Sequence, residues 1–416
     1  MAYSDVFQTF ASMTDVALKE NWLPALYDVA FDHTRRSKKC LYKDVPRSKQ
    51  DVRGNQVYLA FLKEIGWSWR AMSEFGYTPT GSPAEFAEGL ASMSAMASAL
   101  QVTETAIKAT EGDISRIGDI LSFEMRNLQK TFPLMARNAF WLGSTGTLGK
   151  GAGAISTLTV TLDNDGLNHT SIRDRAKYFV RGMFVQMYDT SNNKVGDPVK
   201  ITSTNEALGT ITLASDPGYN DNYYFVSADV AGLESAISGY SPGILDVVDD
   251  NNTFQGINRS TAGNEMFQAN IDDNSGTPRD LQYEAFTDWL YEIGNPEKAY
   301  THYRIIRKYF NDNLKSKQRF VDTGAGTGYA DDFASVQIGN TMLVPRDDCH
   351  HDKIIVIDPS SLKWADKGGM EDLLGMGWQQ TAGRPFLERN LVWWNLLYAT
   401  EMNDGFGGYF DLDPSI

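Results

Sequence analysis

The densest group of side chains that could do chemistry is the run Asp347-Asp-Cys-His-His-Asp352. Thiolate, imidazole and carboxylate groups are all competent metal ligands. Adjacent residues cannot all point at one ion, however, and no second group with ligand spacing lies nearby in the sequence. Because Pro345 precedes the run and a predicted strand follows it, we interpret the run as a polar loop between strands. The alternative, a metal-dependent enzyme, requires stoichiometric metal in the purified protein.

Two glycine-rich segments could be taken for phosphate-binding loops. In residues 143–151, Gly-Ser-Thr-Gly-Thr-Leu-Gly-Lys-Gly, the first required glycine falls on Ser144, and Gly151 stands where a metal-binding hydroxyl is needed. The segment also follows a predicted helix, whereas a phosphate-binding loop follows a strand. Residues 324–329, Gly-Ala-Gly-Thr-Gly-Tyr, lack the dinucleotide spacing and indicate a flexible loop. Neither segment predicts a nucleotide site.

No other pattern favours catalysis. The chain has five histidines, two of them in the 347–352 loop, and it lacks the Gly-x-Ser-x-Gly sequence of a nucleophile elbow. We therefore predict a protein that is not an enzyme and that carries no cofactor and no metal.

Composition limits the class of protein further. A chain of 416 residues predicts two or three domains, and its 42% hydrophobic content is typical of a folded protein. With 38 basic and 53 acidic residues, the net charge of −15 repels polyphosphates, so the chain as a whole is not a nucleic-acid binder. Two distant cysteines, Cys40 and Cys349, form no disulfide framework and indicate a reducing compartment. The sequence predicts neither a signal peptide nor a membrane span.

One basic run departs from the acidic balance. Residues 33–39, His-Thr-Arg-Arg-Ser-Lys-Lys, contain four cations. The favoured interpretation is a solvated loop, and the alternative is an arm that meets nucleic acid or an acidic neighbour. The cations of that arm are Arg35, Arg36, Lys38 and Lys39.

The segment from Arg53 to about Gly89 is rich in turns and in aromatic residues. Aromatic side chains scattered through such a stretch rarely form a core of their own, so we expect an extended excursion that buries them against another surface. Residues 91–110 then predict a returning strand. The candidates for contacts with a neighbouring subunit are Trp67, Trp69, Phe75 and Tyr77.

Two blocks of different composition follow. Apolar residues recur at three- and four-residue steps from Ile114 to Leu128, which predicts an amphipathic helix that a glycine signal ends at residues 142–143. From Ile155 to about Asp229 the chain alternates polar and apolar residues and is rich in Thr, Val, Asn and Gly. Five strand candidates in this block, at 157–162, 184–188, 199–202, 210–213 and 223–226, predict an inserted small β-barrel or sandwich.

The remainder of the chain has an α+β pattern. Residues 280–310 predict a helical region broken at Gly294-Asn-Pro. Strands are predicted at 335–344, 353–357 and 391–400. The last, LVWWNLLYAT, is apolar on both faces and should be a central or an interface strand.

The order of these blocks resembles the major capsid proteins of tailed bacteriophages, which have the Hong Kong 97-type fold. Four phrases are similar to that family: Arg181-Gly-Met-Phe-Val-Gln-Met-Tyr-Asp in the β-rich block, residues 243–261, Gly339-Asn-Thr-Met-Leu-Val-Pro, and Lys353-Ile-Ile-Val-Ile-Asp. The resemblance covers most of the chain and implies an α+β fold with an inserted β-barrel or sandwich. It implies an N-terminal arm (1–50), an extension loop (51–110), a spine helix with the peripheral domain (111–154), a β-rich insertion (155–232), an axial domain with return to peripheral strands (233–385), and a C-terminal strand and tail (386–416).

The resemblance also implies a function. The chain would assemble in the host bacterial cytoplasm into hexamers and pentamers of an icosahedral shell around double-stranded DNA, and would reside in the virion. Its expected partners are other copies of itself, a separate scaffolding protein, a portal protein at one vertex and a decoration or cement protein, with weak non-specific contact to DNA and none to membranes. We expect the β-rich insertion on the exterior. Lys63 lies where the founding member has its cross-linking lysine, but nothing else in the sequence supports cross-linking.

Two alternatives remain open. An encapsulin-like bacterial compartment has the same fold, but such chains are typically shorter and usually lack a β-insertion. The β-rich block could instead be a carbohydrate-binding module of a phage structural protein or adhesin. The β-insertion favours the capsid over the encapsulin. The arm and the spine helix inferred from the sequence favour it over the carbohydrate-binding module.

Overall fold

The structure is a computed structural model that describes only part of the chain. The described residues are 40–48, 52–66, 81–103, 128, 131–144, 146–156, 158–163, 171–228, 241–309, 311, 336–358, 360–372, 379–380, 386–400 and 406–414. They form a β-rich fold with a few short helices, so the α+β expectation holds only in part. No helix among these residues is long and apolar enough to cross a membrane.

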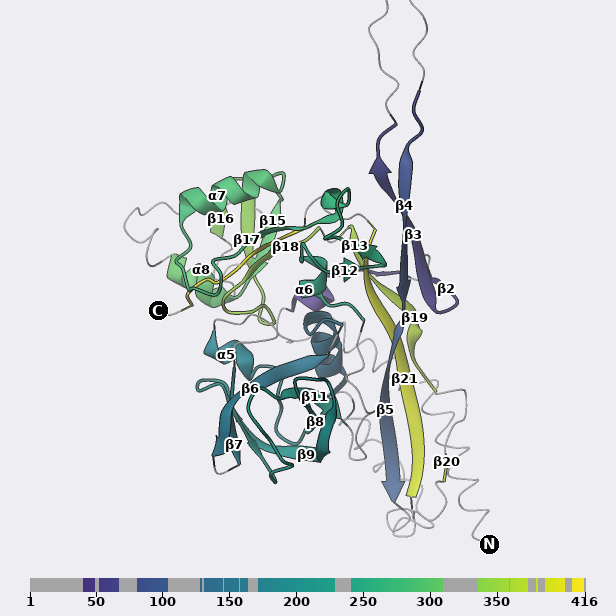
Figure 1. The fold of residues 1–416 in the computed structure, drawn as a ribbon, viewed down its shortest axis with the longest axis vertical. Coiled ribbons are helices and arrows are strands. Elements are labelled where there is room, and N and C mark those ends of the chain that lie inside the picture. The colour runs from purple at the N-terminus through teal and green to yellow at the C-terminus, as the bar shows by residue number, and fades with distance from the viewer. Residues whose placement is uncertain are drawn as a thin grey trace, which may run out of the picture.

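The longest strand, β21 (Phe386–Ala399), lies at the centre of the fold. It pairs antiparallel with β5 (Ser94–Thr103) on one side and with β19 (Leu362–Asp372) and β20 (Gln379–Gln380) on the other. Strand β1 (Arg47–Ser48) extends this sheet parallel to β19. Figure 1 shows β5 and β21 running side by side along the long axis of the molecule. The prediction of a central strand near residues 391–400 is confirmed.

The two faces of β21 are covered by different parts of the chain. Leu391, Trp393 and Leu397 belong to the largest hydrophobic cluster, whereas Leu396 and Tyr398 belong to a smaller cluster on the other face. Successive side chains of a strand point to opposite faces, so a strand that is covered on both faces must be apolar throughout.

A helix over residues 131–141 packs against this sheet. Its Phe132 meets Trp393 edge-to-face at a centroid distance of 5.3 Å, and its Phe140 lies 6.0 Å from Trp364. The helix ends before Gly143, whose φ of +68° is the left-handed conformation that glycine adopts readily. A Cβ at Gly143 would also lie 2.8 Å from the Asp246 carboxylate. The predicted glycine stop is confirmed, whereas the predicted helical stretch from Ile114 to Leu128 lies outside the described residues except for Leu128.

The β-rich block is a closed six-stranded barrel with the order β10-β7-β6-β11-β8-β9. This confirms an inserted β-unit and shows a barrel rather than a sandwich. The strands are β6 (Thr147–Ser156), β7 (Thr159–Leu162), β8 (Phe184–Tyr188), β9 (Lys194–Asn205), β10 (Thr210–Leu213) and β11 (Tyr224–Ala228).

Strand β6 was not predicted, because its sequence TLGKGAGAIS is rich in glycine. Its glycines accommodate aromatic rings of the barrel. A Cβ at Gly151 would lie 2.1 Å from the hydroxyl oxygen of Tyr219, and one at Gly149 would lie 3.1 Å from the ring of Phe179. The glycine-rich segment that suggested a phosphate loop is therefore a barrel strand.

A second sheet has its own hydrophobic core. Its six strands have the order β14-β22-β18-β15-β17-β16 and mix parallel and antiparallel pairs. They are β14 (Asn270–Asp272), β22 (Gly407–Tyr409), β18 (Ile354–Val356), β15 (Lys298–Thr301), β17 (Thr341–Pro345) and β16 (Val336–Ile338). We call this sheet, with α7 (Tyr283–Glu292) and α8 (Tyr303–Tyr309), the six-stranded unit.

Helix α7 packs Phe286 and Trp289 against Tyr409 of β22. The break at Gly294 was predicted correctly, and its φ is +92°. Two expectations for this unit need correction. The predicted helical region 280–310 contains strand β15 between its two helices, and the predicted strand 335–344 is the hairpin of β16 and β17. Strand β15 has only four residues, which are too few for a periodicity to show.

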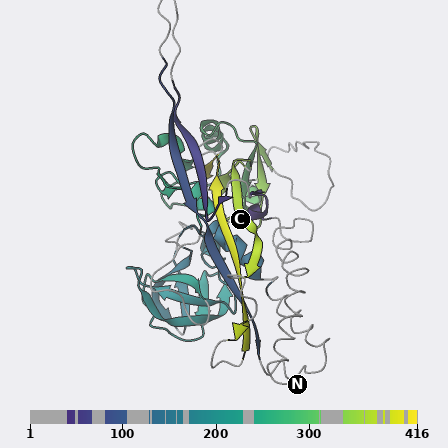
Figure 2. The same cartoon turned by 90° about the vertical axis from the view of Figure 1, so that its right-hand side faces the viewer.

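The third sheet projects from the rest of the molecule. It consists of β2 (Val52–Arg53), β3 (Gln56–Glu64) and β4 (Glu85–Ser92), all antiparallel. Figures 1 and 2 both show β3 and β4 extending away from the other sheets, and we call this hairpin the arm. The remaining elements are η2 (Leu41–Lys43), α5 (Ile172–Arg175), α6 (Ile244–Val247), β12 (Thr253–Phe254), β13 (Ile257–Asn258) and η3 (Glu265–Phe267).

Replacing Trp393 by alanine should lower the free energy of unfolding by about 3–5 kcal/mol, because the ring is buried between Phe132 and Trp364. Urea denaturation of the purified protein measures the change. Leu62→Ala on the exposed face of the arm is the control and should change the value by less than about 0.5 kcal/mol. Equal losses for both variants would contradict the assignment of Trp393 to the core.

Candidate functional site

The residues that the sequence put forward as contacts lie outside the described residues. This holds for the aromatic candidates Trp67, Trp69, Phe75 and Tyr77 and for the basic candidates Arg35, Arg36, Lys38 and Lys39. Strands β3 and β4 flank the segment with the four aromatic residues. Their geometry identifies a different set of exposed apolar residues.

One face of the arm carries two apolar cross-strand pairs on either side of the Ala60–Glu88 pair, and we call these two pairs the apolar ladder. Tyr58 pairs with Leu90 and Leu62 pairs with Phe86, in a register that places all four side chains on the same face. These side chains are between 42% and 65% exposed, and Ile65 beyond them is 78% exposed. Sequence reasoning did not name these residues as contacts. The four aromatic residues between the two strands gave a stronger signal than the strands themselves.

The opposite face of the arm packs against the subunit. Val57 and Phe61 are buried, and Phe61 meets Phe267 edge-to-face at 6.0 Å. A Cβ at Gly89 would lie 2.4 Å from the Phe61 ring, so this position needs a glycine. The main-chain N–H of Leu90 donates to the carbonyl oxygen of Gln255 at 2.8 Å. The base of the arm is therefore held by the subunit, and its apolar ladder faces away.

Lys63 near the end of β3 forms an ion pair with Glu85 of β4, with Nζ and Oε1 3.1 Å apart. Both side chains are partly exposed, so the pair contributes little to stability. Nothing in this geometry supports a cross-link through Lys63.

The 347–352 loop is a polar loop between β17 and β18, as predicted, and Asp348, Cys349, His350 and Asp352 are buried in it. The Asp348 carboxylate accepts hydrogen bonds from Leu41 N (2.5 Å), Tyr42 N (3.2 Å) and Trp141 Nε1 (3.2 Å). Burial raises the pKa of this carboxyl, although the three hydrogen bonds and the charge of Lys177 oppose the shift. Because the folded state holds the proton more tightly than the unfolded chain, this group's contribution to stability falls as the pH rises above the ordinary carboxyl pKa.

The same loop is bonded to the segment that connects barrel strands β7 and β8. Asp174 of α5 accepts from the main-chain N–H of His351 and contacts its Nδ1, each at 2.6 Å. Lys177 Nζ donates to the carbonyl oxygens of Asp348 and Cys349. The Asp352 carboxylate accepts from Ser171 N at 3.2 Å.

Three of the five histidines converge at this point. The ring of His351 lies 3.9 Å from that of His302 at the end of β15, and His350 contacts the hydroxyl of Tyr178. The loop belongs to the six-stranded unit. It therefore joins this unit to residues 41–42, to the 131–141 helix and to the barrel. Its carboxylates serve main-chain and side-chain donors, and within the described ranges no three acidic, His or Cys side chains are grouped to hold a metal.

The glycine-rich segment offers no phosphate cradle. The N–H of Ser144, which such a loop would direct at a phosphate, donates to Asp246 Oδ2 at 2.9 Å. Lys150 is buried in β6, with its ammonium 5.7 Å from the centroid of the Tyr224 ring. An anion would have to displace a carboxylate to bind here.

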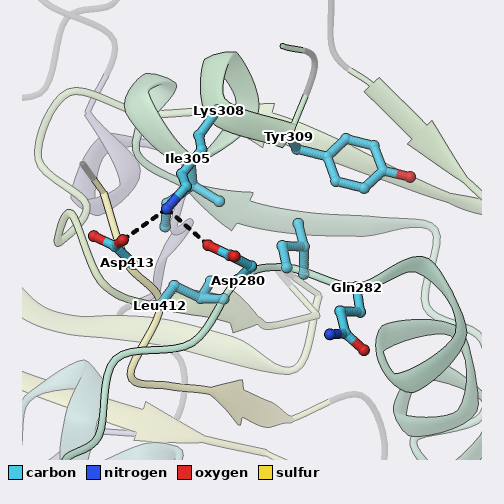
Figure 3. A pocket seen from close by; sticks show the side chains of 8 residues that line it. Asp280, Gln282, Ile305, Lys308, Tyr309, Leu412 and Asp413 are labelled. Atoms are coloured by element: carbon cyan, nitrogen blue, oxygen red, sulfur yellow. Dashed lines mark hydrogen bonds and ion pairs between the residues drawn. The ribbon is translucent and has the colours of Figure 1, made fainter. Parts of the chain in front are cut away.

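A small cavity of about 240 Å³ lies beside α8 (Figure 3). Lys308 Nζ forms ion pairs there with Asp280 and Asp413, each at 2.7 Å. Burial alone would lower the pKa of Lys308, but its hydrogen bonds to the two carboxylates raise it above the ordinary value. The charged groups of the cavity are thus bonded to one another and tie α8 to residues near the C-terminus.

Comparisons with known proteins give matches among solved structures only. No family model matches the sequence, and no curated protein matches it. The structure is similar to the capsid asymmetric unit of cyanophage A-1(L), with 10% identity, 94% of each chain covered and a TM-score of 0.47. It is also similar to the capsid of a native GTA particle, with 8% identity, 91% of each chain covered and a TM-score of 0.43.

A third match is the holo-SrpI encapsulin complex from Synechococcus elongatus PCC 7942. The identity is 10%, the match covers 89% of this chain and 86% of that one, and the TM-score is 0.39. Since all three scores lie below 0.5, we draw the function from the geometry of this chain.

Asp348→Ala should destabilise the subunit by roughly 3 kcal/mol or more, because it leaves three buried donors without an acceptor. Asp189 is the matched control. It also accepts from two main-chain N–H groups, of Ser191 and Asn193, but at the surface, where water can replace it. Denaturant titration of both variants should show a large loss for Asp348→Ala and a small one for Asp189→Ala. Similar losses would contradict the role of Asp348 as a buried junction.

Both thiols should be unreactive in the folded subunit. Burial, reinforced by the nearby Asp348 charge, raises the pKa of Cys40 to about 12, and burial raises the pKa of Cys349 well above its ordinary value. At pH 8 the thiolate fraction of Cys40 is then about 1,000-fold lower than that of a free cysteine. Iodoacetamide should label neither thiol in the native subunit and both in denaturant, as counted by mass spectrometry. Rapid labelling of native Cys40 would contradict this environment.

Proposed function

We propose that the chain is a non-enzymatic shell subunit, the major capsid protein of a tailed bacteriophage, which assembles with copies of itself around double-stranded DNA. The observation that carries the proposal is the arm, whose outward face is an apolar ladder with no partner in the described part of the subunit. A protein that acts alone has no use for such a face, because exposed apolar side chains gathered on one face promote association.

The outer part of the arm is too small to be stable without a neighbour. Beyond the two-residue strand β2 it is a two-stranded hairpin, which is marginal in water, and only its base is held by the subunit. Burial of each of Tyr58, Leu62, Phe86 and Leu90 would contribute roughly 1.5–3 kcal/mol before the entropy of ordering is subtracted. Docking on another subunit therefore couples the ordering of the arm to assembly.

A second copy of the chain is the partner that fits this surface. In this contact the arm of one copy would dock on the body of the next copy. Because the two copies contribute different surfaces, the contact is heterologous. Heterologous contacts between identical subunits close into rings when the rotation permits, and rings of five and six build an icosahedral shell. The net charge of −15 keeps the wall from binding the packaged DNA.

The finer architecture follows from this proposal. The arm belongs to an extension loop at 51–110, the 131–141 helix to the spine helix and peripheral domain at 111–154, and the barrel to the insertion at 155–232. The six-stranded unit belongs to the axial domain at 233–385, and β21 to the C-terminal region 386–416. We place the N-terminal arm at 1–50, with Arg35, Arg36, Lys38 and Lys39 toward the interior. Trp67, Trp69, Phe75 and Tyr77 would extend the contact of the arm.

The partners proposed for the shell are a separate scaffolding protein, a portal protein at one vertex and a decoration or cement protein on the surface. Assembly would take place in the cytoplasm of the host bacterium, and the product would be the virion. An encapsulin-like compartment is the second candidate, and the fold alone suits it equally. The content of purified shells separates the two, since a capsid encloses DNA and a compartment encloses a cargo protein.

Electron microscopy of the protein expressed alone and together with its neighbouring genes tests the proposal. We expect closed polyhedral shells, or tubes and sheets of hexameric rings. A small, monodisperse species under both conditions would overturn the shell function.

Leu62→Glu and Phe86→Glu should abolish assembly while leaving the subunit folded, because each replaces an apolar side chain of the Leu62–Phe86 pair with a charge. Sedimentation velocity measures the loss of assembly, and circular dichroism with a thermal melt verifies the fold. Leu208→Glu is the matched control, since Leu208 is a leucine on the barrel that is 64% exposed, about as much as Phe86 at 65%. Shells from both arm variants would contradict the role of the ladder.

A further inference from the structure

Helix α7 has an exposed face that is acidic and aromatic. Glu284, Asp288 and Glu292 recur at four-residue steps and form a stripe on the solvent side. Tyr283 and Tyr291 lie beside the stripe and are 52% and 64% exposed. The buried face of the helix, with Phe286, Trp289 and Leu290, already packs on the sheet. The exposed face therefore remains available for a partner.

This stripe is unfavourable in an isolated subunit. Carboxylates four residues apart on a helix repel one another, and Glu292 lies at the end of α7 where the helix dipole disfavours negative charge. Within the described residues, Glu284 and Asp288 form no ion pair, and Glu292 contacts the amide of Asn270 at 3.3 Å. A cationic partner would relieve this repulsion.

Helix α8 exposes the complementary groups. Arg307 is exposed, Arg304 is half-buried, and Tyr303 lies exposed one turn before Arg307. Neither arginine forms an ion pair with the part of the chain that the structure describes. The adjacent Lys308 is different, since Asp280 and Asp413 already neutralise it (Figure 3). The free cations of α8 are thus the two arginines.

The two helices lie on different margins of the six-stranded unit. Figure 1 shows α7 along the upper margin and α8 at the lower margin, near the C-terminus. The acidic face of one copy can therefore meet the basic face of the next copy, and the contact can repeat around a ring. Tyrosine and arginine are the residue types enriched in protein interfaces.

We infer that α7 of one subunit docks against α8 of the neighbouring subunit and forms a ring contact distinct from that of the arm. The inference rests on the proposed shell function. The acidic stripe of α7 pairs with Arg304 and Arg307 of the second copy, and the tyrosines of both helices pack between these charges. The contact weakens at high salt, because exposed ion pairs are screened.

A charge swap tests the contact. Asp288→Arg and Arg307→Asp should each raise the protein concentration needed for assembly by about tenfold or more, since each places like charges against one another. The double variant should assemble like the wild type, because the pair is restored with its signs exchanged. Glu206→Arg, an equivalent charge change on the barrel, is the control and should assemble normally.

Thermal stability separates this effect from misfolding. Asp288→Arg removes the repulsion within α7, so the melting temperature of the unassembled subunit should stay equal to that of the wild type or rise while assembly weakens. A lowered melting temperature that accounts for the loss of assembly would overturn the inference.

A mixture of the two single variants provides a second test of the ring geometry. Alternating subunits satisfy every α7–α8 contact in a ring of six, but a ring of five cannot alternate. The mixture should therefore form tubes or sheets of six-membered rings and no closed shells in electron micrographs. If wild-type protein assembles and both single variants assemble equally well, or if the double variant does not recover, the α7–α8 contact is wrong. If wild-type protein does not assemble at all, the shell function itself fails.

Discussion

Strand β21 is apolar on both faces, and each face must be covered by a different part of the chain. Trp393 on one face packs against Phe132 of the 131–141 helix and against Trp364 of β19. Tyr398 and Leu396 on the other face pack with Val57 at the base of the arm. If only one face of the strand were apolar, either the 131–141 helix or the base of the arm would have no hydrophobic surface to pack against. The arm can project because its base is held by the same strand that organises the core.

A buried polar loop joins the remaining parts to this core. Asp348 binds the main chain at residues 41 and 42 and the indole of Trp141, and Asp174 binds His351 from the barrel side. Buried carboxylates are tolerated only when they are well hydrogen-bonded, so these bonds specify how the parts are oriented. The residues that looked most like a catalytic or metal site therefore hold the subunit in one shape. The proposed shell function requires such rigidity, because small errors in the shape of a subunit would prevent closure.

The surfaces proposed for assembly have the opposite character. The ladder of the arm is apolar and exposed, and α7 and α8 carry charges that have no partner in the described part of the subunit. Each of these surfaces is unfavourable for a subunit in isolation and favourable once a second copy covers it. The stability of the subunit and the affinity between subunits thus depend on different residues. A substitution can therefore change one of these quantities without changing the other.

The sequence by itself determined the elements whose signal is local. The period of two in residues 184–188 and 210–213, the glycine end of the helix at Gly143 and the double-sided apolar run near 391–400 all predicted what the structure contains. Only the tertiary structure decided that glycine-rich residues 147–156 form a barrel strand, because the reason lies in the Tyr219 and Phe179 rings that approach Gly151 and Gly149 from elsewhere in the chain. It also decided that the 347–352 loop is a buried junction, since its partners at residues 41, 141 and 174 are distant in the sequence. Local periodicity reports which face of an element is buried, but not which residues bury it.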